Sequence, residues 1–166
     1  RPAYDMIVQA ISGGMSMTGE PGRSPVRSGV PIGDLSAGMY SVIGALAALE
    51  ERRRSGQGQY IDVSMLDCQV SMLCYQAGYF LHSGKNPGRQ GWGHDSIPTY
   101  RGFNCAKGTS LVITANTERM WQGLCDVLGI AAMKDDSRFI LNEDRYTHRD
   151  ELWPILEGAF MQQTAD

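Results

Sequence analysis

The sequence has few cysteines, no excess of positive charge and no long uninterrupted apolar run. Its four cysteines include no Cys-x-x-Cys pair, which argues against a structural zinc site. Because the sequence shows no secretory signal, we expect reduced thiols and a cytoplasmic location. A net charge of −3 does not favour nucleic-acid binding. The longest nearly continuous apolar stretch, Met39–Leu49, is shorter than the roughly 20 residues that cross a bilayer, so we expect no membrane partner.

Composition and length indicate a folded protein with a modest core. Hydrophobic residues make up 42% of the 166 positions and charged residues 20%, which argues against a disordered chain. The element order strand, helix, strand, helix predicts an α/β fold for residues 1–84. Residues 85–166 have a different order, two strands and then helices, which predicts a smaller α+β domain. We therefore place a domain boundary near Gly84.

The clearest element is a helix over Leu35–Arg54. Its apolar residues recur at helical spacing, namely Leu35, Met39, Val42, Ile43 and Leu46. Asp34 stands where an N-cap is expected, and Arg52–Arg54 suit the negative end of the helix dipole. Gly56 marks the expected end of this helix.

The other elements are predicted from the alternation of apolar and polar residues, from β-forming residues and from helix-capping residues. Two strands are expected in the first half, Tyr4–Ala10 and Gln59–Met65. A second helix is expected from an N-cap at Asp67 to Gly84. The second half is expected to contain strands over Tyr100–Asn104 and Ser110–Ala115, a helix capped by Thr117 and a final helix after Thr147.

Asp34 is the strongest candidate for a catalytic group. The dipole and the free backbone N–H groups of a helix start favour an ionised carboxylate there. Such a carboxylate can attack an activated carbonyl and form a covalent acyl intermediate, and the small residues after Asp34 leave room for a substrate. A plain N-cap explains the same pattern, and Asp67 shares that pattern with no function assigned to it.

Three weaker candidates have ordinary structural explanations as well. His94 lies in a glycine-rich loop beside Asp95 and is the one histidine that we consider a site candidate. Glu118, at the start of a predicted helix, is either an acid or base or a residue favoured there by the dipole. Arg52–Arg54 either bind a phosphorylated ligand or form a solvated helix end. Spacing predicts no metal cluster and no Ser-His-Asp set.

Blocks of residues spread over nearly the whole chain match the pattern of one enzyme family. The most specific block comprises Gly33-Asp34, Gly38-Met39, Ile43–Leu49, Arg54–Gln59 and Asp62–Asp67. Weaker blocks are Tyr4-Asp5, Gln9-Ala10, Ser12–Met15, Thr18-Gly19, Met120-Trp121 and Leu124-Cys125. Together they resemble the class III CoA-transferases, which include formyl-CoA transferase and the carnitine CoA-transferases.

The resemblance implies that Asp34 is the catalytic aspartate. In that family the aspartate attacks an acyl-CoA thioester to give a mixed anhydride. The released CoA thiolate then forms an aspartyl-CoA thioester, and an acceptor carboxylate completes the exchange. The implied partners are acyl-CoA and a carboxylic acid, with coenzyme A as a substrate, no metal, and an interlocked homodimer. The implied substrate-binding residues are Tyr4, Gly33, Met65, Gly93 and His94.

The resemblance leaves two other functions open. Related α-methylacyl-CoA racemases use the equivalent aspartate with a histidine, and Tyr4 occupies that histidine position. A tyrosine is a poor base at neutral pH, which favours a transferase, although Glu118 falls near an acidic residue of racemases. Family members are more than twice as long as this chain. We therefore expect a middle fragment with part of a Rossmann-like domain, or a truncated, non-catalytic protein.

Overall fold

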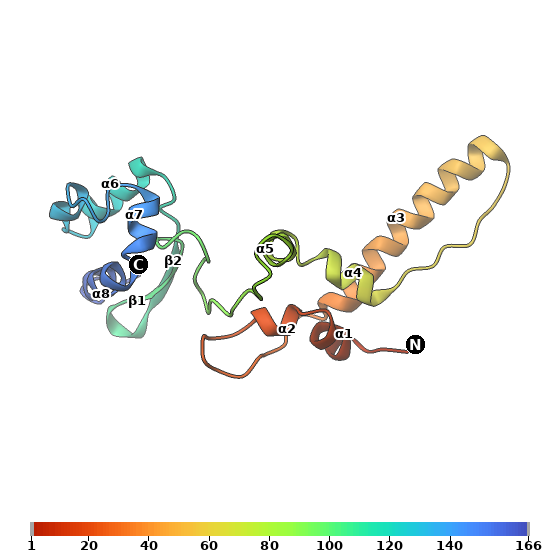
Figure 1. The fold of residues 1–166 in the computed structure, drawn as a ribbon, viewed down its shortest axis with the longest axis horizontal. Coiled ribbons are helices and arrows are strands. Elements are labelled where there is room, and N and C mark those ends of the chain that lie inside the picture. Colours follow the sequence, from red (N-terminus) through yellow and green to blue (C-terminus); the bar gives the residue numbers. More distant parts are fainter. Residues whose placement is uncertain (1, 166) are drawn as a thin grey trace. The chain divides into compact units, whose positions relative to one another are not determined.

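The computed structural model describes residues 2–165, which separate into two compact units (Figure 1). The first unit comprises residues 1–91 and the second residues 92–166. The division lies between Gly91 and Trp92, in the glycine-rich stretch that follows the boundary expected near Gly84. Each unit is described by itself below.

The first unit consists of helices joined by extended segments. Its helices are α1 (Asp5–Ile11), α2 (Gly14–Met17), α3 (Ile32–Ser55), α4 (Met65–Ser71) and α5 (Tyr75–Ser83). α1 packs against α2, α3 and α4, and α4 packs against α3. The buried apolar side chains among the described residues of this unit are Val8 and Cys68.

Both strands expected in this unit are wrong. Tyr4 is the N-cap residue of α1, and Asp5–Ile11 form that helix. The segment Gln59–Met65 is extended, but it pairs with no strand in the described part of the chain, and α4 begins at Met65. A segment rich in β-forming residues becomes a strand only when a neighbour accepts and donates its backbone hydrogen bonds, and this unit supplies no such neighbour.

Helix α3 is longer than the sequence pattern indicates. It begins at Ile32 rather than Leu35 and ends at Gly56, whose φ of 75° allows the left-handed turn that stops a helix. By length and composition it could cross a membrane, and 11% of its most apolar window is buried. The apolar stretch Met39–Leu49 is therefore only part of a helix that is long enough to span a bilayer, so its length alone does not exclude a membrane span. Core helices pass the same test, so the evidence for a membrane span is weak.

The second helix expected in this unit is interrupted. Ser64, not Asp67, is the N-cap, and its side chain accepts a hydrogen bond of 3.2 Å from the Asp67 N–H. Cys74 separates α4 from α5 with φ 49° and ψ −126°, a conformation that strains a residue with a side chain. α5 ends at Gly84 as expected, with φ 69°.

The second unit combines a two-stranded sheet with helices. Its elements are β1 (Arg101–Asn104), η1 (Ala106–Gly108), β2 (Ser110–Ile113), α6 (Glu118–Val127), η2 (Ala131–Lys134), α7 (Asn142–Thr147) and α8 (Arg149–Phe160). The strands are antiparallel, and Arg101 lies opposite Ile113. The two expected strands are confirmed, and so is the cap of α6, where the Thr117 hydroxyl accepts from the Met120 N–H at 3.2 Å.

A single apolar core holds the second unit together. β1, α6 and α8 contribute most of it, and its buried members are Phe103, Cys105, Trp121, Cys125, Phe139, Leu152, Leu156 and Phe160. The rings of Phe103 and Phe160 stack with centroids 4.5 Å apart, which joins the sheet to α8. The second unit thus has a core of its own.

Candidate active site at the start of α3

The N-terminus of α3 is capped by a residue from another helix. Pro31 occupies the N-cap position and has no side-chain oxygen to offer. Instead, Asp5 Oδ1 on α1 accepts a hydrogen bond of 2.9 Å from the Gly33 N–H. The expected N-cap role of Asp34 is therefore wrong, because Asp34 lies within the first turn of α3.

A buried glutamine holds Asp5 in this position. Gln9 is 2% exposed, and its Nε2 donates to Asp5 Oδ2 at 2.8 Å. Its Oε1 accepts from the Ser28 N–H, also at 2.8 Å, which ties down the loop before α3. Sequence reasoning missed both Asp5 and Gln9 as parts of the site. The tyrosine–aspartate pair and the glutamine were visible in the sequence, but no local pattern connects them to a helix that begins more than 20 residues later.

Gly33 is buried directly beneath this cap. A Cβ added at Gly33 would lie 3.1 Å from Asp5 Oδ1 and 3.5 Å from Gln69 Oε1. Ser36, which is fully buried, donates its hydroxyl to the Gly33 carbonyl at 3.0 Å. Gly33 thus lets α1 and α4 approach the first turn of α3. Its expected contact with substrate stays a prediction.

The Asp34 carboxylate is exposed at this helix start. It forms no hydrogen bond or ion pair with any of residues 2–165, and its backbone N–H is likewise without an acceptor there. Asp34 lines an open groove of about 580 Å³ together with Leu35, Gly38, Met39, Val42 and Ile43. The groove is mostly apolar apart from this carboxylate. The arrangement leaves a carboxylate oxygen accessible to an electrophile, beside the positive end of a 24-residue helix.

The other expected site residues divide between the two units. Tyr4, next to Asp5, is 80% exposed, and Met65 is half-buried at the start of α4, which packs on α3. Gly93 and His94 belong to the second unit. Their contact with the site of Asp34 therefore stays a prediction.

His94 has well-defined surroundings within the second unit. Its ring stacks on Tyr100 with centroids 5.4 Å apart, and its Nδ1 lies 3.2 Å from Asp95 Oδ1. The His94 N–H donates to the Tyr100 carbonyl at 2.9 Å. Gly93 forms an isolated antiparallel bridge to Arg101, the first residue of β1. These contacts fix both residues to the sheet.

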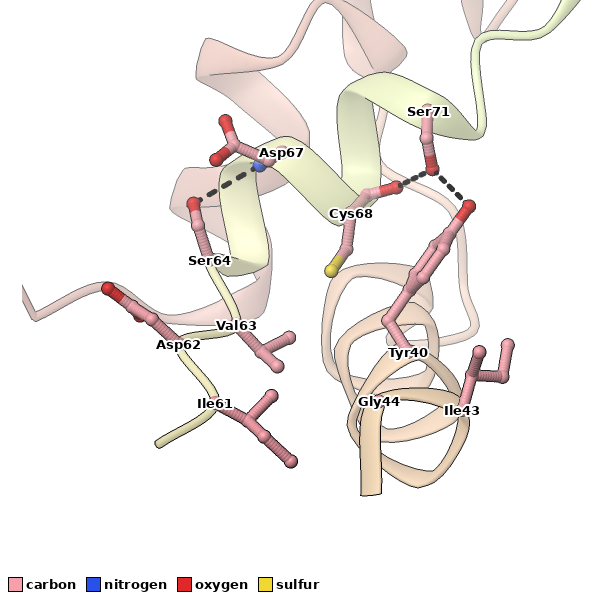
Figure 2. Close-up of a pocket in the computed structure, with 10 residues that line it drawn as sticks. All are labelled: Tyr40, Ile43, Gly44, Ile61, Asp62, Val63, Ser64, Asp67, Cys68 and Ser71. Atoms are coloured by element: carbon pink, nitrogen blue, oxygen red, sulfur yellow. Dashed lines mark hydrogen bonds between the residues drawn. The ribbon is translucent and has the colours of Figure 1, made fainter. Parts of the chain in front are cut away.

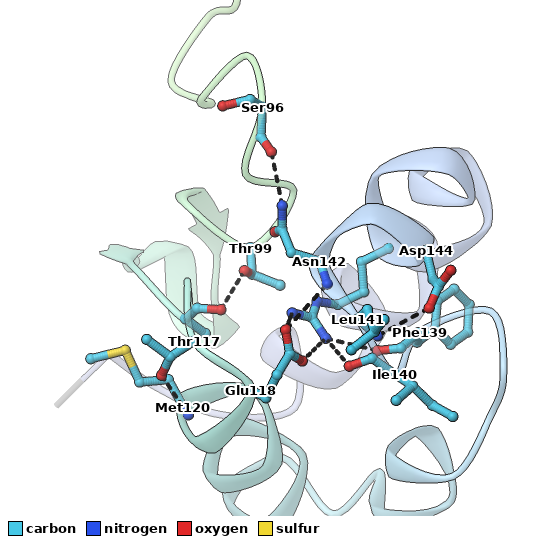
Figure 3. A network of polar contacts seen from close by, with 12 residues as sticks. Ser96, Thr99, Thr117, Glu118, Met120, Phe139, Ile140, Leu141, Asn142 and Asp144 are labelled. Carbon is cyan, nitrogen blue, oxygen red and sulfur yellow. Dashed lines mark hydrogen bonds and ion pairs between the residues drawn. The ribbon is translucent and has the colours of Figure 1, made fainter.

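Glu118 has a structural partner. Its two carboxylate oxygens accept hydrogen bonds of 2.8 and 3.1 Å from Arg145, whose side chain is fully buried. Glu118 Oε1 also accepts from the Asn142 N–H at 3.2 Å (Figure 3). Arg145 donates further to the carbonyls of Phe139 and Ile140. Both oxygens of Glu118 are therefore engaged in holding α6 to α7, which favours the structural explanation over acid–base chemistry.

The described residues contain no group of three or more His, Cys, Asp or Glu side chains arranged to hold a metal ion. A carboxylate exposed at a helix start, with neighbouring residues organised around the backbone beneath it, suits covalent acyl transfer.

The sequence of this chain matches one family of known proteins over its whole length. A family model described as CoA-transferase family III matches residues 1–166. The chain belongs to this family.

Individual relatives agree with this assignment. The succinate–glutarate CoA-transferase of Agrobacterium fabrum is 40% identical over 153 residues, which are 92% of this chain and 38% of that protein. The acetyl-CoA:oxalate CoA-transferase of Acetobacter aceti is 38% identical over 99% of this chain and 42% of its own length.

A solved structure shows the same relationship. The crystal structure of a CaiB/BaiF family protein from Brucella suis matches with a TM-score of 0.83 and 36% identity. The match covers 99% of this chain and 43% of that protein. The chain therefore has the fold of the corresponding part of a larger family member, and it spans about two fifths of the length of these relatives.

Proposed function

We propose that these 166 residues are the nucleophile-bearing part of a longer CoA-transferase, with Asp34 as its covalent acyl carrier. The observation that carries the proposal is that capping and exposure fall to two different carboxylates at the start of α3. Asp5 caps the helix, and the Asp34 carboxylate is left exposed and without a partner in the described chain. A residue that served only as a cap would make the contact that Asp5 makes.

The chemistry requires a carboxylate that can both attack and carry an acyl group. An oxygen of Asp34 attacks the thioester carbonyl, the carbon–sulfur bond breaks, and CoA leaves as the thiolate. The thiolate attacks the aspartyl carbonyl of the resulting anhydride, which releases the donor acid as its carboxylate. The acceptor carboxylate then attacks the aspartyl-CoA thioester, and its carbon–sulfur bond breaks to give a second anhydride and free CoA thiolate. The thiolate attacks the acceptor acyl carbonyl, which forms the acceptor's CoA thioester and releases Asp34 as its carboxylate.

The helix start contributes electrostatic stabilisation. Each attack places negative charge on a carbonyl oxygen, and the Asp34 N–H and the positive end of α3 lie beside the carboxylate where this charge develops.

We further propose that residues 1–91 belong to a Rossmann-like domain completed by polypeptide outside this chain. The relatives' names support a dicarboxylic acceptor, because they specify glutarate, oxalate and mesaconate.

The test uses the full-length protein with panels of acyl-CoA donors and dicarboxylate acceptors. We expect Asp34→Ala to abolish CoA transfer, and hydroxylamine to convert the acylated wild-type enzyme to an aspartyl hydroxamate at this position. Asp67→Ala is the matched control, because Asp67 stands in the first turn of α4 as Asp34 does in α3. Transfer retained by Asp34→Ala would refute the assignment, and α-hydrogen exchange into deuterated solvent without an acceptor would indicate a racemase.

A further inference from the structure

A buried amide on α4 lies beside the start of α3. Gln69 is 5% exposed, although an amide side chain ends in two hydrogen-bonding atoms. Within residues 2–165, Gln69 Oε1 has no hydrogen-bond partner. Buried polar atoms are normally paired, because an unpaired one loses its bonds to water without replacement. Apolar packing therefore does not account for a glutamine at this position.

Two glycines border this amide. A Cβ added at Gly33 would lie 3.5 Å from Gln69 Oε1, and a Cβ added at Gly14 would lie 3.5 Å from Gln69 Nε2. The position of the Gly33 Cβ is also 3.1 Å from Asp5 Oδ1, which accepts the hydrogen bond from the Gly33 N–H. The amide therefore lies beside the carboxylate that caps α3, next to the residue that precedes Asp34.

The helix that carries this amide is anchored to α3 by other residues. The hydroxyl of Ser71 lies 2.8 Å from that of Tyr40 on α3, and Ser64 caps the start of α4 (Figure 2). The buried Cys68 lines the cavity between these two helices. Because α4 also packs against α1, contacts within this unit fix the position of Gln69 near α1 and α3.

The observed orientation of the amide places two acceptors near each other. Gln69 Oε1 and Asp5 Oδ1 both approach the position that a Gly33 Cβ would take, and neither donates a hydrogen when Asp5 is ionised. A half-turn about the last side-chain bond exchanges the amide oxygen and nitrogen without changing the shape of the group. The N–H groups then face Asp5. The oxygen then faces Gly14, whose N–H forms a long hydrogen bond of 3.4 Å to Ser12 Oγ.

We propose that Gln69 is a positioning residue for CoA transfer: its Nε2 donates to Asp5 Oδ1 and so holds the start of α3, and with it the Asp34 carboxylate, in place for attack. The inference rests on the proposed function of Asp34. Gln9 donates to the other oxygen of Asp5 at 2.8 Å, so the two glutamines hold this carboxylate from both sides. A displacement of about 1 Å near a reacting group can slow a reaction about 100-fold, which makes a fixed helix start important.

A donor from outside this chain is the competing explanation. Water, substrate or further polypeptide would then donate to Gln69 Oε1 in its observed orientation. The two explanations use opposite ends of the amide. Our proposal needs its N–H group, whereas an outside donor needs its oxygen.

Two substitutions in the full-length protein separate these explanations. Gln69→Glu keeps an acceptor but places a second carboxylate near Asp5, and Gln69→Met keeps a similar volume without the amide. We expect each to slow the single-turnover acylation of Asp34, measured per folded molecule, about tenfold or more, the factor that one hydrogen bond to a charged group supplies. The KM for acyl-CoA should stay within about twofold, because Gln69 acts through Asp5. Gln122→Glu, exposed on α6, is the matched control and should acylate at the wild-type rate.

A double substitution tests the contact itself. The Asp5→Asn background lacks the neighbouring charge, so Gln69→Glu should slow acylation there by about threefold at most, and the two substitutions should couple in urea unfolding followed by circular dichroism. Wild-type acylation and stability in Gln69→Glu, with no coupling to Asp5→Asn, would assign Oε1 to an outside donor and overturn the proposal. If Asp34→Ala retained CoA transfer, the proposed function would fail, whereas the unfolding measurements would still test the contact between Gln69 and Asp5.

Discussion

The Asp5 carboxylate accepts a hydrogen bond from the Gly33 N–H at 2.9 Å, although the two residues are 28 positions apart. The bond joins α1 to the first turn of α3 and satisfies one of the backbone donors that every helix start exposes. Asp34, the next residue, therefore does not cap the helix. The position of the proposed nucleophile thus depends on a contact that local sequence cannot reveal.

Removing the cap should weaken both the helix start and catalysis. We expect Asp5→Ala to lower the free energy of unfolding of the first unit by about 1 kcal/mol, the usual cost of losing an N-cap, and to reduce CoA transfer by the full-length protein. Urea unfolding and initial rates measure the two effects. Asp5→Asn retains an oxygen acceptor and should preserve most of the stability. If Asp5→Ala and Asp5→Asn behaved like the wild type in both assays, the cap would have no role.

Gly33 should be intolerant of a side chain, for a reason separate from helix propensity. Gly33→Ala places a Cβ 3.1 Å from Asp5 Oδ1, so we expect it to displace the cap and destabilise the first unit by about 1 kcal/mol or more. Gly38→Ala is the matched control in the same helix, because nothing lies within 4 Å of its added Cβ. It should stabilise the helix by up to about 1 kcal/mol. Equal effects of the two variants in urea unfolding would contradict this explanation.

The two units show which features local sequence can predict. In the second unit, the strands and the Thr117 cap follow from patterns a few residues long, and the neighbours that complete them lie in the same unit. In the first unit, the β-forming residues at Tyr4–Ala10 and Gln59–Met65 have no strand beside them, and the first of these segments is helical. Strand formation depends on distant partners, so propensity alone misassigned both segments.

The sequence suggests the candidate residue Asp34 but not the residues that hold the start of α3 in place. The sequence makes Asp34 a candidate because it is an acidic residue beside a helix start followed by small residues. The structure leaves its carboxylate exposed, and its catalytic role stays a prediction. Asp5 and Gln9 were not identified as supports, because their contacts cross from α1 to the loop and helix beyond it. Side-chain networks of this kind are set by tertiary packing, which has no periodic signature.

The ion pair between Glu118 and Arg145 should stabilise the second unit against unfolding. Arg145 is fully buried, so Glu118→Ala leaves a buried guanidinium without its carboxylate. Because Glu118 is itself partly exposed, we expect a loss near the low end for a broken buried pair, about 3 kcal/mol. Urea unfolding followed by tryptophan fluorescence measures the loss, because all three tryptophans lie in the second unit and one of them, Trp121, packs against Arg145. Glu143→Ala on α7 should change the stability little, and a similarly small loss for Glu118→Ala would contradict a structural role.

Acid should weaken the second unit through Asp136. Hydrogen bonds from Arg138 lower the pKa of Asp136 to about 2. Because the folded-state pKa is depressed, the contribution of Asp136 to stability is present above its ordinary pKa of about 4 and is lost as the pH falls toward 2. We expect Asp136→Asn to flatten the fall in the unfolding midpoint between pH 5 and pH 2. An unchanged pH profile for this variant would show that other groups cause the acid sensitivity.

The four thiols should differ sharply in reactivity. Cys74 is exposed, whereas Cys68, Cys105 and Cys125 are buried. Burial raises the pKa of Cys125 to about 11, so its thiol stays protonated, and therefore unreactive, throughout the neutral range. At pH 8 we expect Ellman's reagent to modify one thiol rapidly in the folded chain and all four in denaturant. Cys74→Ser should remove the rapid phase, while Cys125→Ser should leave it intact. Because the folded-state pKa of Cys125 is raised, its contribution to stability is present below the ordinary thiol pKa of about 8.5 and declines as the pH rises toward 11. A rapid phase that survived Cys74→Ser would mean that one of the buried thiols is accessible in solution.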